Sequence, residues 1–276
     1  PGLGFGHRRL SIVGLSDGDQ PIYNEDRTVA IVFNGEIFDH LELRADLIAK
    51  GHTFRTHTDT EVVVHLYEEY GEDIFERLNG QFAFALYDAK RRTIFLARDK
   101  VGICPLNWTR HGDWIYFGSE VKAILASGDI DAACDMRALN HIFKFFALGT
   151  RRTMFEGIHS VLPGHYLKIA FRPDGKPAEI VERRYWDLEF PDEGDEENPA
   201  DITPLVDEFE RVFHNAVDLR LRADVPVVSY LSGGVDSAYV LATAAKIRGE
   251  APPSFTIKVP SGKLDEASDA LATADY

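Results

Sequence analysis

The sequence Leu231-Ser-Gly-Gly-Val-Asp-Ser237 lies between an apolar stretch and a helical pattern. The apolar stretch, Val225–Leu231, is typical of a strand buried on both faces. The pattern that follows predicts a helix over about Ser237–Arg248. Ser254–Val259 predicts the next strand. Because strand, helix and strand in succession form the unit of a parallel α/β sheet, this part of the chain predicts a parallel α/β domain.

The turn between this strand and helix has the residues of a phosphate-binding loop. Gly233 and Gly234 allow a tight turn in which backbone N–H groups approach an anion, and the following helix dipole favours negative charge. Ser232 and Ser237 add hydroxyl donors, while the carboxylate of Asp236 suits a magnesium ion that bridges phosphates. The alternative is a plain strand–helix turn in which Ser237 is the N-cap.

An acidic segment rich in turn-forming residues, Phe190–Asp201, precedes this domain. It has too few apolar side chains to offset the entropy of ordering, so we interpret it as a linker, with a long loop as the alternative. We therefore expect one domain over residues 1–189, a linker over 190–201 and a second domain over 202–276. The second domain opens with a helix predicted over Thr203–Leu221, whose core-facing residues are expected to be Leu205, Phe209, Val212, Phe213 and Val217.

Short β patterns separated by turns fill the first domain, and at least two helices interrupt them. The clearest strands are Val29–Phe33, Gln81–Tyr87, Thr93–Ala97, Trp114–Phe117 and His165–Ile169. Helices are predicted over Asp39–Lys50 and over Asp59–Tyr70, the second with Val62, Leu66 and Tyr70 on one face. This pattern predicts an α+β domain of packed sheets with helices outside them.

Composition excludes several classes of protein. The 276 residues suffice for two domains, and 45% hydrophobic with 27% charged residues is typical of a globular chain. A net charge of −15 argues against nucleic-acid or anionic-membrane binding. Cys104 and Cys134 are too few for a disulfide framework, so we expect a cytoplasmic protein. The ten histidines show no metal-binding spacing, and we expect them to be structural or on the surface.

The segment around Ser232–Ser237 resembles the loop of the N-type ATP pyrophosphatases, which adenylate a carbonyl oxygen and release pyrophosphate. The resemblance implies that ATP and Mg²⁺ bind here, with the ion held by Asp236 through pyrophosphate. No tightly bound organic cofactor is expected. The residues implied to bind ATP are Leu231, Ser232, Gly233, Gly234, Asp236, Ser237 and Ile257, of which the first and last act through their backbone.

Several blocks of the first domain resemble the class II glutamine amidotransferase domain, in the order found in the asparagine synthetase B family. They are Gly6–Ile12, Gln20–Pro21, Phe33–Ile37, Thr58–Val62, Leu78–Phe84, Ala97–Asp99 with Gly102, Pro105 and Leu106, Ser119–Ala123 and Tyr185–Trp186. The resemblance covers nearly the whole chain. It implies a four-layer α/β/β/α sandwich of the Ntn-hydrolase type, followed by the start of a Rossmann-like parallel α/β ATP-pyrophosphatase domain.

The family resemblance also implies the roles of individual residues. Asn34 and Gly35 would form an oxyanion hole, the former through its side-chain amide and the latter through its backbone N–H. Arg9 would bind the α-carboxylate of glutamine and Asp59 its α-ammonium group, with Glu36 also at the glutamine site. Taken alone, Asn34-Gly35 is also typical of a hairpin turn.

Two further features qualify this resemblance. Thr58 and Glu61 fit a helix capping box, which is compatible with a binding role for Asp59. The family's nucleophile is an N-terminal cysteine, and neither Cys104 nor Cys134 can replace it, since neither has a free α-amine. We therefore expect a fragment truncated at both ends and inactive by itself. Glutamate release from glutamine that Asn34→Ala abolishes would contradict this expectation.

The resemblance implies a glutamine-dependent asparagine synthetase that transfers ammonia to aspartate activated by ATP as its β-aspartyl-AMP. One alternative is an amidotransferase or amide-forming ligase with another carboxylate acceptor, such as a natural product or a sugar. The other is a non-catalytic paralogue that binds glutamine or nucleotide. The expected partners are thus glutamine, aspartate or another carboxylate acceptor, and ATP, with a homodimer as a further expectation.

Overall fold

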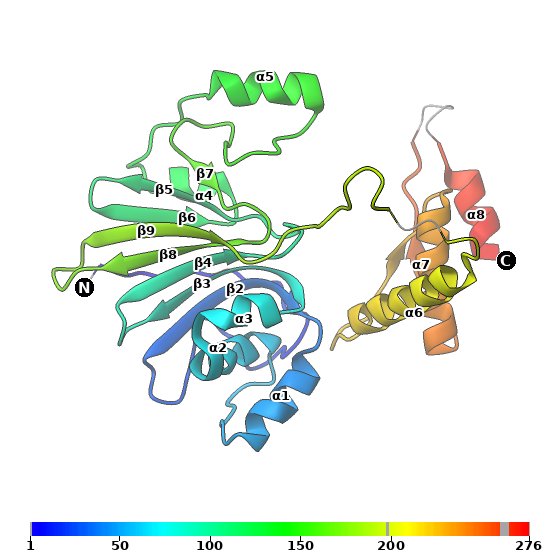
Figure 1. The fold of residues 1–276 in the computed structure, drawn as a ribbon, viewed down its shortest axis with the longest axis horizontal. Helices are drawn as coiled ribbons and strands as arrows, with labels where there is room; N and C mark the ends of the chain where they lie inside the picture. The colour runs from blue at the N-terminus through cyan, green and yellow to red at the C-terminus, as the bar shows by residue number, and fades with distance from the viewer. Residues whose placement is uncertain (1, 197–198, 260–264, 276) are drawn as a thin grey trace. The chain divides into compact units, whose positions relative to one another are not determined.

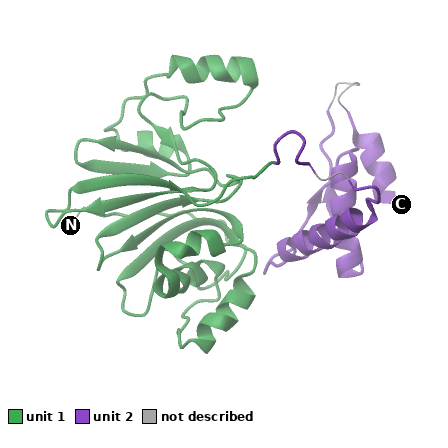
Figure 2. Cartoon of the chain, in the orientation of Figure 1, with its two compact units in different colours: residues 1–190 green, residues 191–276 purple. Residues whose placement is uncertain are grey.

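The computed structural model describes residues 2–196, 199–259 and 265–275. The chain divides into two compact units, Pro1–Phe190 and Pro191–Tyr276 (Figure 2). The junction falls at the start of the predicted linker, whose residues 197–198 lie outside the described part. The linker's other residues form no helix or strand.

A six-stranded antiparallel sheet with the order β1-β2-β3-β4-β8-β9 forms the centre of the first unit (Figure 1). Its strands are β1 (Ile22–Tyr23), β2 (Val29–Ile37), β3 (Gly80–Asp88), β4 (Thr93–Arg98), β8 (His165–Phe171) and β9 (Pro177–Arg184). The strands predicted in β2, β3, β4 and β8 are confirmed. The pattern did not single out the two edge strands, β1 and β9.

Large and small side chains alternate along β3, and this alternation decides what packs on each face of the sheet. Phe82 and Phe84 point toward the helices and are buried among large side chains, whereas Ala83 and Ala85 face the other way. The helical layer consists of α1 (His40–Ala49), α2 (Asp59–Tyr70), the 3₁₀ turn η1 (Gly71–Asp73) and α3 (Ile74–Arg77). Phe75 of α3 stacks on Phe84 and on Tyr166, with ring centroids 6.1 and 4.0 Å apart. Phe82 and Phe84 therefore belong to the core between the large sheet and these helices.

Small side chains on the opposite face allow a second sheet to approach. This sheet has the order β6-β5-β7, with β5 (Asn107–His111), β6 (Trp114–Gly118) and β7 (His159–Ser160). Ala83, Ala85 and Leu96 of the large sheet share a core with Trp108 and Phe117 of the small one. Two helices, α4 (Val121–Leu125) and α5 (Met136–Phe145), complete the unit, and α5 lies beyond the small sheet (Figure 1). The layers follow the predicted α/β/β/α order.

The second unit contains α6 (Thr203–Arg220), β10 (Ser229–Tyr230), α7 (Val235–Arg248), β11 (Ser254–Phe255) and α8 (Ala267–Asp275). Strands β10 and β11 are parallel and α7 connects them, as the sequence predicts. Both strands are shorter than predicted, because they pair over only two residues each within the described part of the unit. Helix α7 begins at Val235, two residues before the predicted start, and its N-cap is Gly234. Ser237 is therefore not the N-cap.

The prediction for α6 is partly wrong. Val217 is buried, but Leu205, Phe209 and Val212 are each at least half exposed. Phe213 stacks on Tyr239 of α7, with ring centroids 4.5 Å apart. The apolar face of α6 thus packs on α7 through these rings rather than along its whole length.

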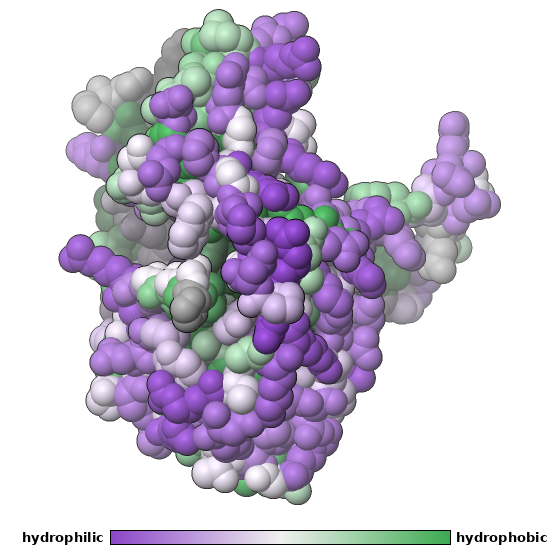
Figure 3. Space-filling model, turned by 90° about the vertical axis from the view of Figure 1, so that its left-hand side faces the viewer, coloured by the Kyte–Doolittle hydropathy of each residue, from purple (hydrophilic) through white to green (hydrophobic). Residues whose placement is uncertain are grey.

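Hydrophilic residues predominate on the face seen in Figure 3, where apolar residues appear as small separate patches. Among the described residues, no helix has both the length and the apolar composition needed to span a bilayer.

Candidate functional site

Asn34 and Gly35 lie inside β2, opposite Ala83 and Phe82 of β3, so the hairpin-turn alternative is wrong. Both residues are exposed, although the strand before them is buried. Gly35 has φ +140°, and a Cβ atom at this position would lie 2.0 Å from the carbonyl oxygen of Gln81. Only glycine fits here, for steric and conformational reasons. The strand therefore exposes the side-chain amide of Asn34 next to the backbone of Gly35, which has no side chain of its own to cover it.

Asp59 is the first residue of α2 and is 5% exposed. Its Oδ2 atom accepts the backbone N–H of Ile37 at 2.8 Å, which joins the start of α2 to the end of β2. Burial raises the pKa of the Asp59 carboxyl, and the hydrogen bond from Ile37 opposes this rise. A cation bound beside this carboxylate would favour its charged form. The position therefore suits an ammonium ligand.

The start of α2 is capped as predicted in one respect only. Thr58 is the N-cap, and its hydroxyl accepts the N–H of Glu61. The Glu61 carboxylate accepts the N–H groups of Arg55 and Thr56, at 2.8 and 2.7 Å, together with the Thr56 hydroxyl. A capping box would instead place it on the N–H of Thr58, whose partner here is the hydroxyl of Thr56. The result is a rigid connection into the helix that carries Asp59.

Arg9 is tied to the same corner of the unit. Its guanidinium donates to the carbonyl oxygen of Gly14 at 2.9 Å and to that of Val13. Gly14 lies against Thr58, since a Cβ atom at Gly14 would be 2.6 Å from Thr58 Cγ2. The structure thus connects Arg9, through Gly14, to Thr58, the N-cap of α2. Two of the N–H groups of the Arg9 guanidinium are therefore already used to bind the backbone of Val13 and Gly14.

Three neighbours of Asn34 received no role from sequence reasoning. The amide of Gln20 bonds the backbone of Phe33 twice, accepting its N–H at 2.7 Å and donating to its carbonyl at 3.1 Å. The Asn34 amide donates to Ser119 Oγ at 3.5 Å. Burial lowers the pKa of His7, a hydrogen bond with the backbone of Phe33 opposes this, and the charge of Arg9 adds to the lowering. The only signal was that all three lie in the family-like blocks.

The two cysteines lie in unlike surroundings. Cys104 is buried in the core between the sheets, where burial, followed by the charge of Asp99, raises the pKa of its thiol to about 11. The Asp99 carboxylate fixes the turn between β4 and Cys104, because it accepts the N–H groups of Phe82, Val101, Gly102, Ile103 and Cys104. Cys134 is exposed and forms an isolated β-bridge with Phe155. A protonated, buried thiol is a poor nucleophile.

In the second unit, a compact set of hydrogen bonds closes the loop from Ser232 to Ser237. The two hydroxyl groups lie 2.9 Å apart, and Ser237 Oγ accepts the N–H of Ser232 at 3.1 Å. The Ser232 hydroxyl also accepts the N–H of Gly234 at 3.2 Å. The loop thus turns both hydroxyl groups and two backbone N–H groups toward the same place. An anion would replace these internal hydrogen bonds with stronger charge-assisted ones.

The other residues predicted to bind nucleotide flank this loop. Leu231 is buried and donates its N–H to the carbonyl of Phe255 at 2.9 Å, while Ile257 is 75% exposed. Asp236 is exposed in the first turn of α7. Gly233 lies against α8, since a Cβ atom there would be 2.8 Å from Cβ of Asp269. Carboxylates beside a phosphate loop require a cation between them and the phosphates, so this donor set fits Mg²⁺.

Comparison with known proteins identifies two family models along the chain. The model described as "Glutamine amidotransferase domain" matches residues 1–186, and the model described as "Asparagine synthase" matches residues 208–276. Asparagine synthetase [glutamine-hydrolyzing] 3 of Bacillus subtilis is 41% identical over 90% of this chain. Amidase chyE of Penicillium rubens is 38% identical over 89% of it. This chain covers 40% and 35% of those two relatives.

Among solved structures, glutamine phosphoribosylpyrophosphate amidotransferase from B. subtilis matches 93% of this chain. The identity is 19% and the TM-score is 0.43, and the match covers 53% of that chain.

Proposed function

This chain belongs to the glutamine amidotransferase domain family, and from that premise we propose that it serves a glutamine-dependent asparagine synthetase. In the proposed reaction, ammonia released from glutamine attacks aspartate that ATP has activated as β-aspartyl-AMP, giving asparagine and AMP. The observation that carries the proposal is the succession of the two family matches on one chain, over residues 1–186 and 208–276. The chain spans about 40% of the length of the asparagine synthetase relatives it matches.

In the glutamine half, each charged group of the substrate needs a partner of opposite charge, and this requirement gives each residue its proposed role. Attack on the glutamine amide creates an oxyanion, which the Asn34 side chain and the Gly35 N–H would stabilise. Asp59 would bind the α-ammonium group, and the resulting ion pair would keep this buried carboxylate ionised. Arg9 would bind the α-carboxylate with the N–H groups that do not hold Val13 and Gly14. Glu36, which follows Gly35 on β2, would lie at the edge of this site.

In the nucleotide half, the loop from Ser232 to Ser237 would hold the phosphates of ATP through hydroxyl and backbone donors. Leu231 and Ile257 would contact the nucleotide through their backbone. Mg²⁺, held by Asp236 through pyrophosphate, would supply charge neutralisation when the acceptor carboxylate displaces pyrophosphate. We infer no tightly bound organic cofactor.

Titration of the 276-residue chain with L-glutamine and, separately, with ATP and Mg²⁺ tests the two halves by calorimetry. We expect each ligand to bind, Asn34→Ala to weaken glutamine alone and Ser232→Ala to weaken ATP alone. If neither ligand binds, the proposed function is wrong. A single variant that abolishes binding of both ligands equally would point to misfolding, which circular dichroism reports.

A second candidate function follows from the relatives named amidases, Amidase chyE of P. rubens and Amidase chry2 of Gibberella zeae. The chemistry would be the same, with a different carboxylic acid as acceptor. Exchange of labelled pyrophosphate into ATP, measured on a chain extended to the length of these relatives, distinguishes the two, because it requires the acceptor to be adenylated. Stimulation by aspartate supports the first function and stimulation by another acid the second. Ligand binding without exchange would support the non-catalytic paralogue.

The cellular setting stays a prediction. We expect a cytoplasmic protein that forms a homodimer and binds neither nucleic acid nor membranes, as the charge of −15 indicates.

A further inference from the structure

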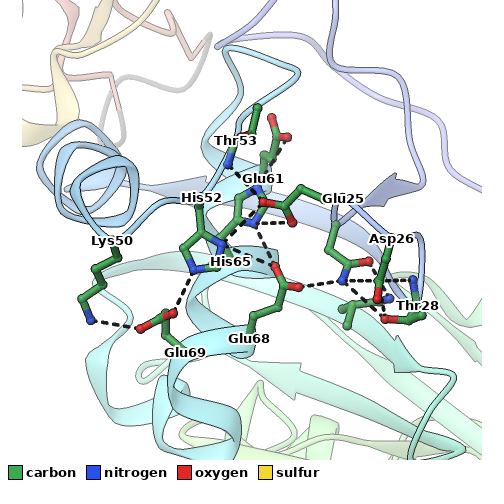
Figure 4. A network of polar contacts seen from close by, with 12 residues as sticks. Glu25, Asp26, Thr28, Lys50, His52, Thr53, Glu61, His65, Glu68 and Glu69 are labelled. Atoms are coloured by element: carbon green, nitrogen blue, oxygen red, sulfur yellow. Dashed lines mark hydrogen bonds and ion pairs between the residues drawn. The ribbon is translucent and has the colours of Figure 1, made fainter.

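Two histidines and two glutamates from distant parts of the sequence meet beside α2 (Figure 4). Glu25 follows β1, His52 follows α1, and His65 and Glu68 lie three residues apart on α2. Each offers one potential ligand atom, and these four atoms lie within 4.8 Å of one another. No role in glutamine or nucleotide binding has been assigned to any of them.

Several pairwise distances in this cluster are close to those of a metal site. His65 Nδ1 lies 2.9 Å from Glu68 Oε2 and 3.5 Å from Glu25 Oε2. His52 Nδ1 lies 3.7 Å from Glu68 Oε2 and 3.6 Å from Oε1 of Glu25, the oxygen that does not face His65. Four tetrahedral ligands at ordinary zinc–nitrogen and zinc–oxygen distances are about 3.3–3.5 Å apart. The widest separation in the cluster is up to 4.8 Å, so the side chains would have to move together by about 1 Å in total to share one ion.

Neighbouring groups already orient the two carboxylates. Oε1 of Glu25 accepts the N–H of Thr53 at 3.0 Å, and Oε1 of Glu68 accepts the side-chain amide of Asn24 at 2.7 Å. The second oxygen of each carboxylate is left facing His65. Fixed outer partners of this kind are typical of metal ligands, because they reduce the freedom lost when the ion binds.

The outer nitrogens of the two imidazoles also face carboxylates. Nε2 of His52 lies 3.0 Å from Glu69, whose other oxygen is 3.2 Å from Lys50. Nε2 of His65 lies 3.6 Å from Glu61, and both of these side chains are 1% exposed. The hydrogen bond with Glu69 directs the opposite nitrogen of His52 toward the ion and raises its basicity, whereas Nε2 of His65 has no hydrogen-bond partner among the described residues and has Glu61 only as a nearby charge.

The charges near the cluster also favour a cation. Lys50 offsets Glu69, and backbone N–H groups of Arg55 and Thr56 stabilise Glu61. The charges of Glu25 and Glu68 then face two imidazoles that are neutral when they bind a metal. One divalent cation neutralises this pair of carboxylates. Protonated imidazoles are the competing arrangement, in which the same contacts are ion pairs.

We propose that Glu25, His52, His65 and Glu68 form a binding site for one divalent transition-metal ion of the Zn²⁺ type. Two nitrogens and two carboxylate oxygens suit Zn²⁺, whereas Mg²⁺ and Ca²⁺ prefer oxygen ligands alone. Four protein ligands leave no open position, so the role is structural. The ion would connect the β1–β2 turn, the segment after α1, and α2, whose first residue is Asp59.

Zinc titration of the 276-residue chain, free of affinity tag and stripped of metal, tests this site. We expect one equivalent to bind, Co²⁺ to give the visible absorption of a four-coordinate ion, and excess Zn²⁺ to raise the unfolding midpoint by about 5–10 °C. His52→Ala with Glu25→Gln should weaken binding by more than about 100-fold. Glu69→Gln, which removes only an outer partner, should weaken it by about 10–100-fold.

The matched control is His111→Ala, because His111 is an exposed histidine at the end of β5. It should bind zinc as the wild type does. Wild-type affinity in the His52→Ala, Glu25→Gln variant, no binding by the wild type, or a six-coordinate Co²⁺ spectrum would each overturn the proposal. Far-UV circular dichroism of the metal-free variants keeps a folding defect distinct from the loss of a ligand. Both exchanges affect side chains at or near the surface, which favours intact folding.

Discussion

The carboxylate of Asp59 accepts the backbone N–H of Ile37 at 2.8 Å. Ile37 follows Gly35 by two residues on β2. This bond therefore fixes the distance between Asp59, which we propose binds the ammonium group, and the proposed oxyanion donors Asn34 and Gly35. The start of α2 and the end of β2 thus behave as one rigid corner. Substitutions at this corner separate effects on charge, shape and stability.

Asp59→Asn keeps an acceptor oxygen for Ile37 but removes the charge. We expect L-glutamine to bind about 10- to 150-fold more weakly, which corresponds to the loss of about 1.5–3 kcal/mol from a charge-assisted interaction. Calorimetry measures the affinity, and thermal unfolding should stay near the wild-type midpoint. Asp46→Asn, on the exposed side of α1, is the control and should bind normally. Equal affinity in the Asp59→Asn variant would contradict the assigned role.

Gly35→Ala should destabilise the first unit by at least about 2 kcal/mol, because the new Cβ atom would be 2.0 Å from the carbonyl oxygen of Gln81. Gly112→Ala is the control, since Gly112 also has positive φ but has no atom within 4 Å of the new Cβ. Its cost should be about 1 kcal/mol, from backbone strain alone. Urea unfolding measures both. Similar losses in the two variants would show that β2 adjusts to the extra methyl group.

Ser237→Ala should weaken the binding of ATP with Mg²⁺ by about tenfold, because it removes a hydroxyl that can donate to phosphate. Ser229→Ala removes a hydroxyl from β10 that donates to the carbonyl of Tyr230, and should leave the affinity unchanged. Competition with a fluorescent ATP analogue measures both variants. Parallel losses in the two variants would mean that the loop has no specific role.

Cys104 should resist thiol reagents in the folded protein, whereas Cys134 is exposed and should react. Because burial and Asp99 raise the pKa of Cys104 from 9.0 to about 11, the folded state retains this proton longer than the unfolded state does. Its contribution to stability is full below pH 9.0 and is lost as pH rises through about 11. Ellman titration before and after unfolding checks the reactivity.

The pH dependence of Cys104 has its own test. Cys104→Ala should flatten the decline in the free energy of unfolding between pH 9.0 and about 11, and Cys134→Ala should leave that decline unchanged. A native Cys104 that reacts as fast as Cys134 at neutral pH would show that the thiol is accessible.

The sequence by itself determined the features that depend on neighbouring residues. The alternation of phenylalanine and alanine along Phe82–Ala85 set which face of β3 meets the helices. The glycine turn after an apolar strand predicted the β10–α7 connection, and Thr58 predicted the start of α2. Backbone preferences, side-chain periodicity and helix caps act over a few residues, so they can be recognised without the fold.

Only the tertiary structure decided which distant residues meet and which surfaces are covered. It placed Asn34-Gly35 inside a strand, because pairing with β3 outweighs the local preference for a turn. It left Phe209 of α6 exposed, although its pattern predicts burial. It also brought Glu25 and His52 to His65, although no spacing in the sequence links them. Such contacts depend on how whole elements pack, because burial and pairing energies are shared among residues far apart in the chain.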